Sequence, residues 1–382
     1  MQNRMPLVEA MLKYKNEKVY PFHTPGHKGG RGMEALLKNE LGAGAVAMDV
    51  SLMSELDDIH APSSYIMEAQ NLAAQLYGSD RCFFAVNGTT GAIHVMLMAA
   101  CKAGDKVLVP RNAHRSVAGA LLLANLEPVF AMPEYDAVFG INTQITPQAV
   151  EAMFARHADI KAVLVTSPNY YGQAADLKAI AGIAHAHNAA LLVDEAHGPH
   201  LGFSSKLPPS ALQCGADACA QSTHKILGAM TQCSLLHVKG GRINLTRAAE
   251  AVSLLTTTSP NYLLMASIDA ARYTLAVQGE KMIERALAAA EKLRSCLSKF
   301  AGLKLLDAGC TGKNGIAGFD CTKVTVNTAA WGYSGTEVGD ALRKAGIAVE
   351  LTDAQNVLFL VTFADSGAEY DAVLEKISSV FA

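Results

Sequence analysis

Short apolar runs that alternate with helix-length segments constrain the fold of this 382-residue chain more than any other feature. One intervening segment begins at Thr146-Pro147, where a capping residue is followed by a proline suited to the first helical turn. Uniformly apolar strands between helices indicate a mostly parallel sheet with helices on both faces. We therefore predict an α/β fold with a seven-stranded sheet, formed by residues 82–86, 106–109, 128–131, 162–166, 190–194, 218–220 and 234–238.

The pattern changes after residue 240. A long helix is predicted from residue 262 to about residue 300, with an interruption near Gly279. Strands are predicted after it at 323–326, 347–350 and 357–362, with a helix at 337–345 between the first two. The first part of the chain has many Gly, Pro and His residues and little periodicity, which is typical of an arm or loop. We therefore predict an N-terminal arm (1–60), a large domain (61–255) and a small α+β domain (256–382).

The composition narrows the possible partners. Hydrophobic residues make up 50% of the chain and the mean hydropathy is +0.17. These values favour a large buried sheet together with an apolar subunit interface. The formal net charge is −3 and there is no run of lysine or arginine, so we predict no nucleic-acid or membrane-surface partner.

Neither the N-terminus nor the cysteines indicate export or a metal. The first residues lack the apolar stretch of a secretory signal, and no segment approaches the roughly 20 apolar residues of a membrane helix. The eight cysteines show no C-x-x-C spacing, and most lie in apolar segments. We therefore predict a cytoplasmic protein with no zinc site and no disulfide framework.

Two oppositely charged residues follow neighbouring apolar runs. Lys225 comes shortly after residues 218–220, and Asp194 ends residues 190–194. Ligands of parallel sheets bind outside the carboxyl ends of the strands, where both side chains are expected. Pyridoxal 5'-phosphate (PLP) needs a lysine for its aldehyde and an anion beside its ring nitrogen. The pair therefore predicts a PLP site, although Asp194 read alone also suits a helix cap.

Residues near this pair supply further parts of such a site. Ala196 is small enough to pack on a flat ring, and His197 can orient Asp194 or the phenolic oxygen of the cofactor. His114 follows a strand and precedes a helix, where an imidazole can stack on a ring. The residues Asp194, Glu195, His197 and His200 also have the types of metal ligands, but no further group completes a metal site in the sequence.

A phosphate site is predicted at residues 87–91, with the sequence Asn-Gly-Thr-Thr-Gly. This segment opens a helix, and the N–H groups and dipole of a helix start favour an anion. Gly88, Thr89 and Thr90 can alternatively form only a tight turn that caps the helix. Ser222 and His224 flank Lys225 closely enough to contact the same phosphate. The segment is neither a Walker loop nor a dinucleotide fingerprint.

Taken in order, several motifs resemble those of the Orn/Lys/Arg decarboxylase family of fold-type-I PLP-dependent enzymes. The resemblance runs from about residue 20 to residue 270 and continues weakly beyond. The motifs are Phe22-His23-Thr24-Pro25-Gly26-His27-Lys28-Gly29-Gly30, Leu56-Asp57-Asp58-Ile59-His60, Asn87-Gly88-Thr89-Thr90-Gly91, Asn112-Ala113-His114-Arg115-Ser116, Ser167-Pro168-Asn169-Tyr170-Tyr171-Gly172, Val193-Asp194-Glu195-Ala196-His197-Gly198, Ser222-Thr223-His224-Lys225 and Thr257-Thr258-Ser259-Pro260-Asn261-Tyr262.

The resemblance implies a role for each site residue. Lys225 is expected to bind the cofactor aldehyde, Asp194 to pair with the pyridine nitrogen and His114 to stack on the ring. The phosphate is expected to be held by Thr89, Thr90, Ser222 and His224. A residue of 257–259 is expected to reach the phosphate of a neighbouring subunit, since such sites form at a dimer interface. The chain has no receiver-like N-terminal domain and stops near Ala382, where larger members carry a further C-terminal domain.

The leading hypothesis is decarboxylation of lysine, ornithine or arginine to the corresponding amine. Lys225 or His197 is then expected to return a proton to the α carbon. An acidic partner is expected for the distal amine or guanidinium, with Asp57, Asp58 and Glu350 as candidates. Two alternatives stay open: another PLP reaction, such as transamination, β-elimination or retro-aldol cleavage, and a catalytically silent partner of a decarboxylase.

Overall fold

The computed structural model describes residues 2–382, and its centre is a seven-stranded sheet. The strand order is β1-β10-β9-β8-β6-β2-β3. The pairs from β9 to β3 are parallel, whereas β10 is antiparallel to both of its neighbours. The predicted mostly parallel sheet is therefore confirmed. Its strands are β1 (Arg81–Ala85), β2 (Lys106–Pro110), β3 (Glu127–Ala131), β6 (Ile160–Thr166), β8 (Ala190–Asp194), β9 (Ala218–Gln221) and β10 (Ser234–Val238).

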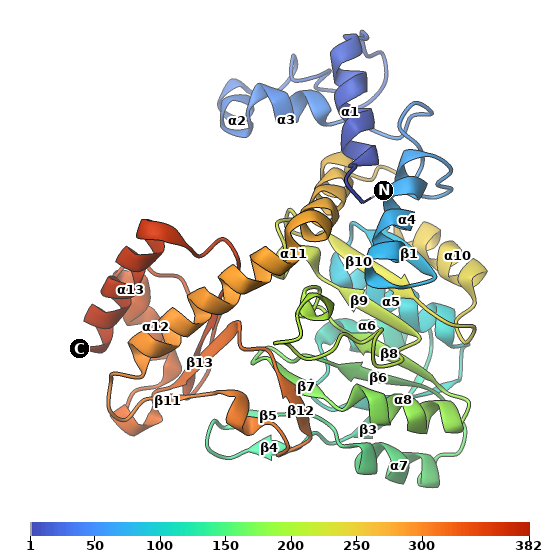
Figure 1. Ribbon diagram of the computed structural model, residues 1–382. Coiled ribbons are helices and arrows are strands. Elements are labelled where there is room, and N and C mark those ends of the chain that lie inside the picture. Colours follow the sequence, from blue (N-terminus) through green and yellow to red (C-terminus); the bar gives the residue numbers. More distant parts are fainter. Residues whose placement is uncertain (1) are drawn as a thin grey trace.

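Helices cover both faces of this sheet because successive strand residues point to opposite sides (Figure 1). On β8, Leu192 packs with α5, α6 and α10, whereas Leu191 and Val193 pack with α7 and α8. Thr146 caps α7 by accepting a hydrogen bond from the N–H of Ala149, so the predicted helix start is confirmed. The helices of this part are α4 (Tyr65–Tyr77), α5 (Gly88–Ala100), α6 (Arg115–Leu123), α7 (Pro147–Arg156), α8 (Leu177–Ala186), α9 (Thr223–Ile226) and α10 (Leu245–Leu255).

A smaller sheet follows later in the chain, with strand order β11-β13-β15-β14. Its apolar residues pack against α12, α13 and the second half of α11. The predicted strand at 347–350 is wrong: these residues form a connection, and the short strand β14 comes directly after it. The elements are β11 (Lys304–Leu305), β13 (Lys323–Asn327), α12 (Gly335–Lys344), β14 (Leu351–Thr352), β15 (Asn356–Leu360) and α13 (Gly367–Phe381).

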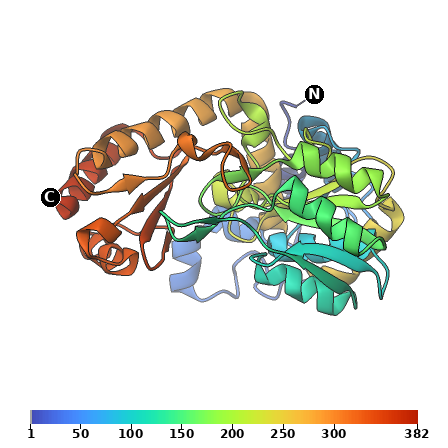
Figure 2. The ribbon, with the colours of Figure 1, turned by 90° about the horizontal axis from the view of Figure 1, so that it is seen from below.

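The helix α11 (Tyr262–Leu297) runs for 36 residues without a break and extends alongside both sheets (Figure 2). The predicted interruption near Gly279 is therefore wrong. A single glycine weakens a helix by only about 1 kcal/mol, and Gly279 is buried within this one. The first half of α11 packs with α1 and α4, and the second half packs with the small sheet.

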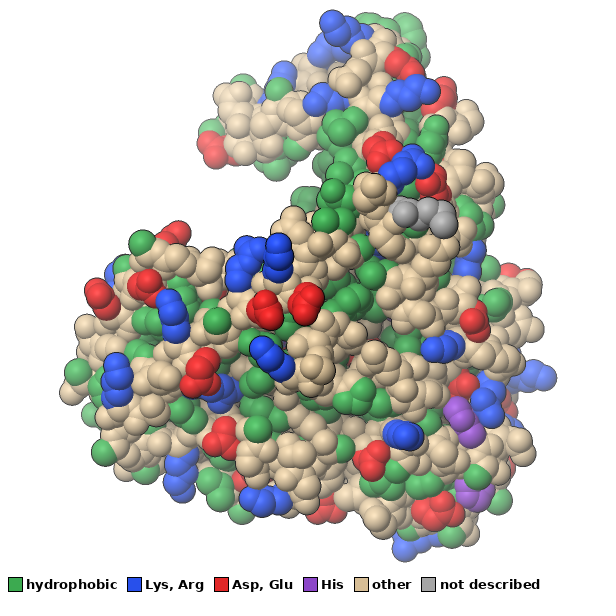
Figure 3. Space-filling view, in the orientation of Figure 1, with side chains coloured by type: hydrophobic (Ala, Val, Ile, Leu, Met, Phe, Trp, Pro, Cys, Tyr) green, Lys and Arg blue, Asp and Glu red, His purple; other side chains and the backbone are tan. Residues whose placement is uncertain are grey.

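The N-terminal arm is helical, which corrects the prediction of a segment without periodic structure. Its helices are α1 (Pro6–Glu17), α2 (Ala35–Leu41) and α3 (Ala43–Met48). Leu7 and Met11 of α1 are buried with α4 and α11. The helices α2 and α3 stand out from the body of the molecule, with a hollow beneath them (Figures 1 and 3).

Short elements connect these parts. The two-stranded sheet β7–β12 joins the turn after β6 to the chain that leads into β13. These elements are β4 (Tyr135–Asp136), β5 (Ile141–Asn142), β7 (Gln173–Ala175), β12 (Ile316–Phe319), and the 3₁₀ turns η1 (Leu201–Phe203), η2 (Ala308–Cys310) and η3 (Ala329–Trp331). Within residues 2–382, every helix is too short or too polar to cross a bilayer.

Candidate active site

A cavity of about 960 Å³ opens at the carboxyl ends of the parallel strands. Parallel α/β sheets bind ligands at this edge. The large sheet and its loops form most of the walls. Residues 353–355, which connect β14 to β15 of the small sheet, close one side. All the residues predicted to bind the cofactor line this cavity, namely Gly88, Thr89, Thr90, His114, Asp194, Ala196, His197, Ser222, His224 and Lys225.

Three hydroxyl groups meet at one end of the cavity, beside the start of α5. Oγ1 of Thr89 is hydrogen-bonded to Oγ of Ser222 and lies 2.8 Å from Oγ of Ser234. Gly88 adopts φ +70°, a conformation that favours glycine, at the first residue of α5. Hydroxyls and free N–H groups at a helix start are donors suited to a phosphate.

His224 has a fixed ring orientation next to this end. Its Nδ1–H donates to the carbonyl oxygen of Cys233 at 2.8 Å, because a carbonyl can only accept. The other ring nitrogen is left as an acceptor, and His224 lines the cavity. The predicted phosphate residues are thus brought together, and Ser234 joins them.

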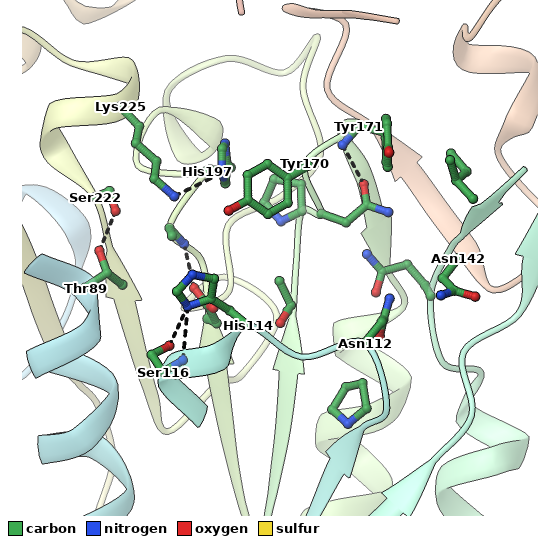
Figure 4. Close-up of a pocket in the computed structure, with 18 of the residues that line it drawn as sticks. Thr89, Asn112, His114, Ser116, Asn142, Tyr170, Tyr171, His197, Ser222 and Lys225 are labelled. Carbon is green, nitrogen blue, oxygen red and sulfur yellow. Dashed lines mark hydrogen bonds between the residues drawn. The ribbon is translucent and has the colours of Figure 1, made fainter. Parts of the chain in front are cut away.

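Lys225 lies against two aromatic side chains, and the three groups point toward one another in Figure 4. Its Nζ is 3.1 Å from Nε2 of His197 and 5.5 Å from the ring centre of Tyr170. The rings of His197 and Tyr170 are 4.6 Å apart at 57°. Burial lowers the pKa of Lys225, although the charges of Asp194 and Glu350 oppose this. Burial and the charge of Lys225 hold the pKa of His197 well below its ordinary value. This low pKa favours the neutral form of His197, and its Nε2 shares a hydrogen bond with Nζ of Lys225.

Asp194 ends β8 and is only 3% exposed. Its carboxylate accepts one hydrogen bond, from the N–H of Ala196 at 3.2 Å. Burial raises the pKa of Asp194, and the N–H of Ala196 and the charge of Lys225 oppose this rise. A buried carboxylate with few donors favours a cationic partner in the cavity.

His114 caps α6 and lines the cavity near Asp194. Its Nδ1 accepts from the N–H of Ser116 at 3.2 Å and lies 2.8 Å from Oγ of Ser116. Because a backbone N–H can only donate, Nδ1 carries no proton and the ring is held by its own helix start (Figure 4). The imidazole therefore presents a fixed face to the cavity.

These residues fit PLP. The environment of Asp194 tests the fit. Its carboxylate is buried and accepts one hydrogen bond, and a protonated pyridine nitrogen is a cation that would pair with it. Lys225, with its lowered pKa, suits the aldehyde. The hydroxyls of Thr89 and Ser222 suit the phosphate. His114 and Ala196 line the same cavity and suit the faces of the ring.

Comparison with known proteins is in agreement. The family model described as "Orn/Lys/Arg decarboxylase, major domain" matches residues 5–369. This chain belongs to the Orn/Lys/Arg decarboxylase family. It is 41% identical to the arginine decarboxylase of Bacillus anthracis over 384 residues, which cover 100% of this chain and 78% of the relative. It is 39% identical to the arginine decarboxylase of Bacillus subtilis over 380 residues, covering 99% and 78%.

Solved structures share the fold of this decarboxylase-family chain. The lysine decarboxylase LdcF of Francisella novicida aligns with a TM-score of 0.86 and 24% identity, covering 99% of this chain. This chain spans 59% of that protein. The Bacillus subtilis ureidoglycine-glyoxylate aminotransferase aligns with a TM-score of 0.62 and 15% identity. The predictions of this family, of a PLP-dependent decarboxylase class and of fold type I are confirmed.

Other predicted residues of this family member lie elsewhere. The carboxylate of Asp57 is buried and accepts from the N–H groups of residues 58, 63, 64, 66 and 67, so it organises a turn instead of facing the cavity. Asp58 accepts from the N–H of His60. Asp58, Glu350 and residues 257–259 are not among the residues that line the cavity. Glu350 nevertheless acts on Lys225 through its charge.

The four residues with the types of metal ligands, Asp194, Glu195, His197 and His200, do not face one common point. Glu195 accepts from the N–H of Ala211 and from Nε2 of Gln221, both at 2.7 Å. Nε2 of His200 instead lies 3.2 Å from Oδ2 of Asp320. The residues Asp194 and His197 face the cavity, whereas Glu195 and His200 do not line it.

Several residues in or next to the cavity wall were not predicted. Tyr170 had no role assigned, although it lies within a quoted motif. Tyr171 donates to Oδ2 of Asp353 at 2.7 Å and so ties the rim of the cavity to the small sheet. Ser234 begins the apolar strand β10, and only its hydrogen bond with Thr89, at the start of α5, gives it a role. A contact made only by tertiary folding has no local sequence signal.

Proposed function

We propose that this chain decarboxylates a basic amino acid with PLP, and that arginine is the substrate to test first. The observation that carries the proposal is that the amine of Lys225 and the carboxylate of Asp194 line one cavity with a cluster of hydroxyls at its end. Family membership supports the reaction class. Relatives at 39% to 41% identity named arginine decarboxylase support arginine.

PLP would be held by Lys225, Asp194, His114, Ala196 and the hydroxyl cluster. When bound, it supplies an aldehyde for the amino group and a ring that accepts the electrons released with CO₂. Asp194 would hold a proton on the ring nitrogen through its charge. His114 and Ala196 would orient the ring by contact.

Lys225 and His197 would handle the proton of the reaction. Loss of CO₂ leaves an electron pair on the α carbon, and a proton must reach that carbon to give the amine. Nζ of Lys225 and Nε2 of His197 are hydrogen-bonded to each other, so a proton can pass between them. The ring of Tyr170 packs beside both members of this pair.

The experiment is a product analysis of purified protein with PLP. Arginine, lysine and ornithine would be supplied separately, and CO₂ would be measured with agmatine, cadaverine and putrescine. We expect agmatine and CO₂ in equal amounts from arginine. Lys225→Ala should abolish product, whereas the exposed Lys206→Ala should leave it unchanged. Absence of all three amines would contradict the proposal.

We also propose that the functional unit is a homodimer with shared sites. Apolar side chains of the arm support this, since Phe22 is 92% exposed and Leu36 is 69% exposed. The hollow beneath α2 and α3 is open in Figure 3 and would accept part of a second copy. Light scattering of purified protein would give twice the 40.3 kDa chain mass. A monomer at micromolar concentration would contradict this.

The remaining parts of the proposal concern organisation. The division into an arm (1–60), a large domain (61–255) and a small domain (256–382) follows the change from one sheet to the other. A cytoplasmic location is supported by the eight free cysteines. Limited proteolysis with mass spectrometry would locate the domain boundaries.

A further inference from the structure

Three charged or ionisable side chains are buried together behind the cavity: Asp320, Lys323 and His200, called here the Asp320 cluster. Nζ of Lys323 and Nε2 of His200 each lie 3.2 Å from Oδ2 of Asp320. Asp320 and Lys323 are 0% exposed and His200 is 2% exposed. The other carboxylate oxygen accepts from the N–H and Oγ1–H of Thr322. Burial alone would raise the pKa of Asp320, but Lys323 and His200 hold this pKa well below its usual range.

The cluster joins two parts of the molecule. Asp320 directly follows β12 and Lys323 begins β13, whereas His200 follows β8 of the large sheet. A fully buried ion pair often adds little net stability compared with apolar side chains of the same size. It does, however, require a defined geometry, because each charge must keep its partner.

One contact of the Asp320 cluster leads to Tyr170. The N–H of Asp320 donates to the carbonyl oxygen of Gly172 at 2.7 Å. Gly172 adopts φ +88°, and a Cβ atom there would lie 2.6 Å from the carbonyl oxygen of Asp320 and 3.0 Å from Cγ of Lys323. The turn that carries Tyr170 is therefore pressed directly against the cluster.

A second contact leads to His197. His197 and His200 lie in two consecutive tight turns: the N–H of Gly198 donates to the carbonyl oxygen of Glu195, and the N–H of Leu201 donates to that of Gly198. A Cβ atom on Gly198 would lie 3.0 Å from Cδ of Pro168, so this turn also packs on the turn that carries Tyr170. The position of the His200 side chain therefore restricts the position of the His197 ring.

We infer that the Asp320 cluster is a positioning device that fixes the rings of His197 and Tyr170 around Nζ of Lys225. The role of the cluster in catalysis rests on the proposed function, whereas its structural role does not. Lys323 also acts on His197 through its charge and, with Lys225, keeps the pKa of His197 low. None of the three cluster residues lines the cavity, so they act through the two turns and not by touching substrate.

The main test is the double variant Asp320→Asn/Lys323→Met, which removes both charges and keeps similar shapes. Displacement of a reacting group by about 1 Å can cost about 100-fold in rate. We expect kcat to fall by about 10- to 100-fold while KM changes by less than about threefold. A second readout needs no activity. Nuclear Overhauser contacts between the ring protons of Tyr170 and His197, whose centres are 4.6 Å apart, should weaken in the variant.

A matched control exists in the same chain. Asp269 and Arg272 form another fully buried pair with the same spacing, at the base of the arm. The variant Asp269→Asn/Arg272→Met should change stability and leave the contacts between Tyr170 and His197 as they are in the wild type. Equal weakening in both double variants would overturn the inference, because it would reflect general loosening.

The single variant His200→Gln keeps the pair of Asp320 and Lys323 and tests the link to His197 if the double variant does not fold. We expect weaker ring contacts and a lower kcat for it as well. Wild-type ring contacts and wild-type kcat in whichever of the two variants folds would overturn the inference. If the wild type shows the ring contacts but no amine forms from any substrate, the proposed function fails while the positioning role is still tested by the ring contacts.

Discussion

Nζ of Lys225 and Nε2 of His197 share one hydrogen bond across 3.1 Å. Burial lowers the pKa of both groups, so adding a second proton to the pair is unfavourable. Two nitrogen atoms that share one hydrogen bond and do not readily carry a proton each are suited to a site that must deliver one proton to carbon.

Removal of the imidazole should slow turnover strongly. For His197→Gln we expect kcat to fall by about 10²- to 10⁴-fold, the usual contribution of a general acid or base. The measurement is steady-state amine formation across a range of pH. His187→Gln is the control, since His187 stacks on Phe154 outside the cavity. A kcat within twofold of wild type would show that His197 does not act on the proton.

The partly buried amine of Lys225 should make the stability of the folded chain depend on pH. The folded-state pKa of Lys225 is lower than its unfolded-state pKa, so the unfolded chain binds the proton more tightly. Above the ordinary lysine pKa, Lys225 therefore does not reduce the free energy of unfolding. As the pH falls toward the lower, folded-state pKa, the unfolded chain takes up the proton first and the free energy of unfolding decreases. Lys225→Met without cofactor should therefore melt higher than wild type near neutral pH, and the difference should shrink in alkaline buffer. A difference in melting temperature that is the same at all pH values would contradict the lowered pKa.

Loss of a hydroxyl at the end of the cavity should weaken cofactor binding. Hydrogen bonds to charged groups contribute about 1.5–3 kcal/mol, which corresponds to about 10- to 100-fold in Kd. Thr89→Val should raise the Kd for PLP by this factor, and Ser234→Ala by less, because Ser234 acts through Thr89. Titration followed by absorbance measures both values. Thr274→Val on α11 should have no effect, since Thr274 donates to a carbonyl of its own helix.

Asp57 should matter for stability and not for substrate binding. Asp57→Ala removes the acceptor of the N–H groups of Ser63, Ser64 and Ile66, of which that of Ile66 is buried, and we expect a loss of about 1–3 kcal/mol in the free energy of unfolding. Asp58→Ala, which removes one acceptor, should cost less. Urea denaturation measures both, and KM for arginine should not change. A raised KM in Asp57→Ala would restore Asp57 as a candidate substrate ligand.

Asp57 should also affect acid stability. Burial alone raises its pKa, but the N–H groups of Ser63 and Ser64 lower the pKa of Asp57 below its ordinary value. Its contribution is therefore present above the ordinary aspartate pKa and is lost as the pH falls through the lower, folded-state pKa. Wild type and Asp57→Ala should consequently approach each other in stability in acid.

Local sequence patterns predicted the large sheet well. Strands β8 and β10 begin and end where expected, since uniformly apolar runs between helices have few alternatives. The site residues at the strand ends could be predicted for the same reason, because parallel strands bring their carboxyl ends to one edge. Resemblance to the family supplied the roles that spacing alone left open.

The errors have physical causes. Gly279 predicts an interruption of the helix, but packing on both sides of α11 outweighs the small cost of one glycine. The helices α2 and α3 lack a buried face of their own, so the periodicity that identifies a helix is weak there. The Asp320 cluster and Ser234 depend on partners that are distant in sequence, which no local pattern reveals.

The helix α11 contributes to the hydrophobic core shared with the arm and, at its other end, to the core of the small sheet. Unfolding of either core would therefore expose one end of this helix. Heating should therefore disrupt both halves of the molecule in a single cooperative transition, and a calorimetric trace of the intact chain should contain one peak.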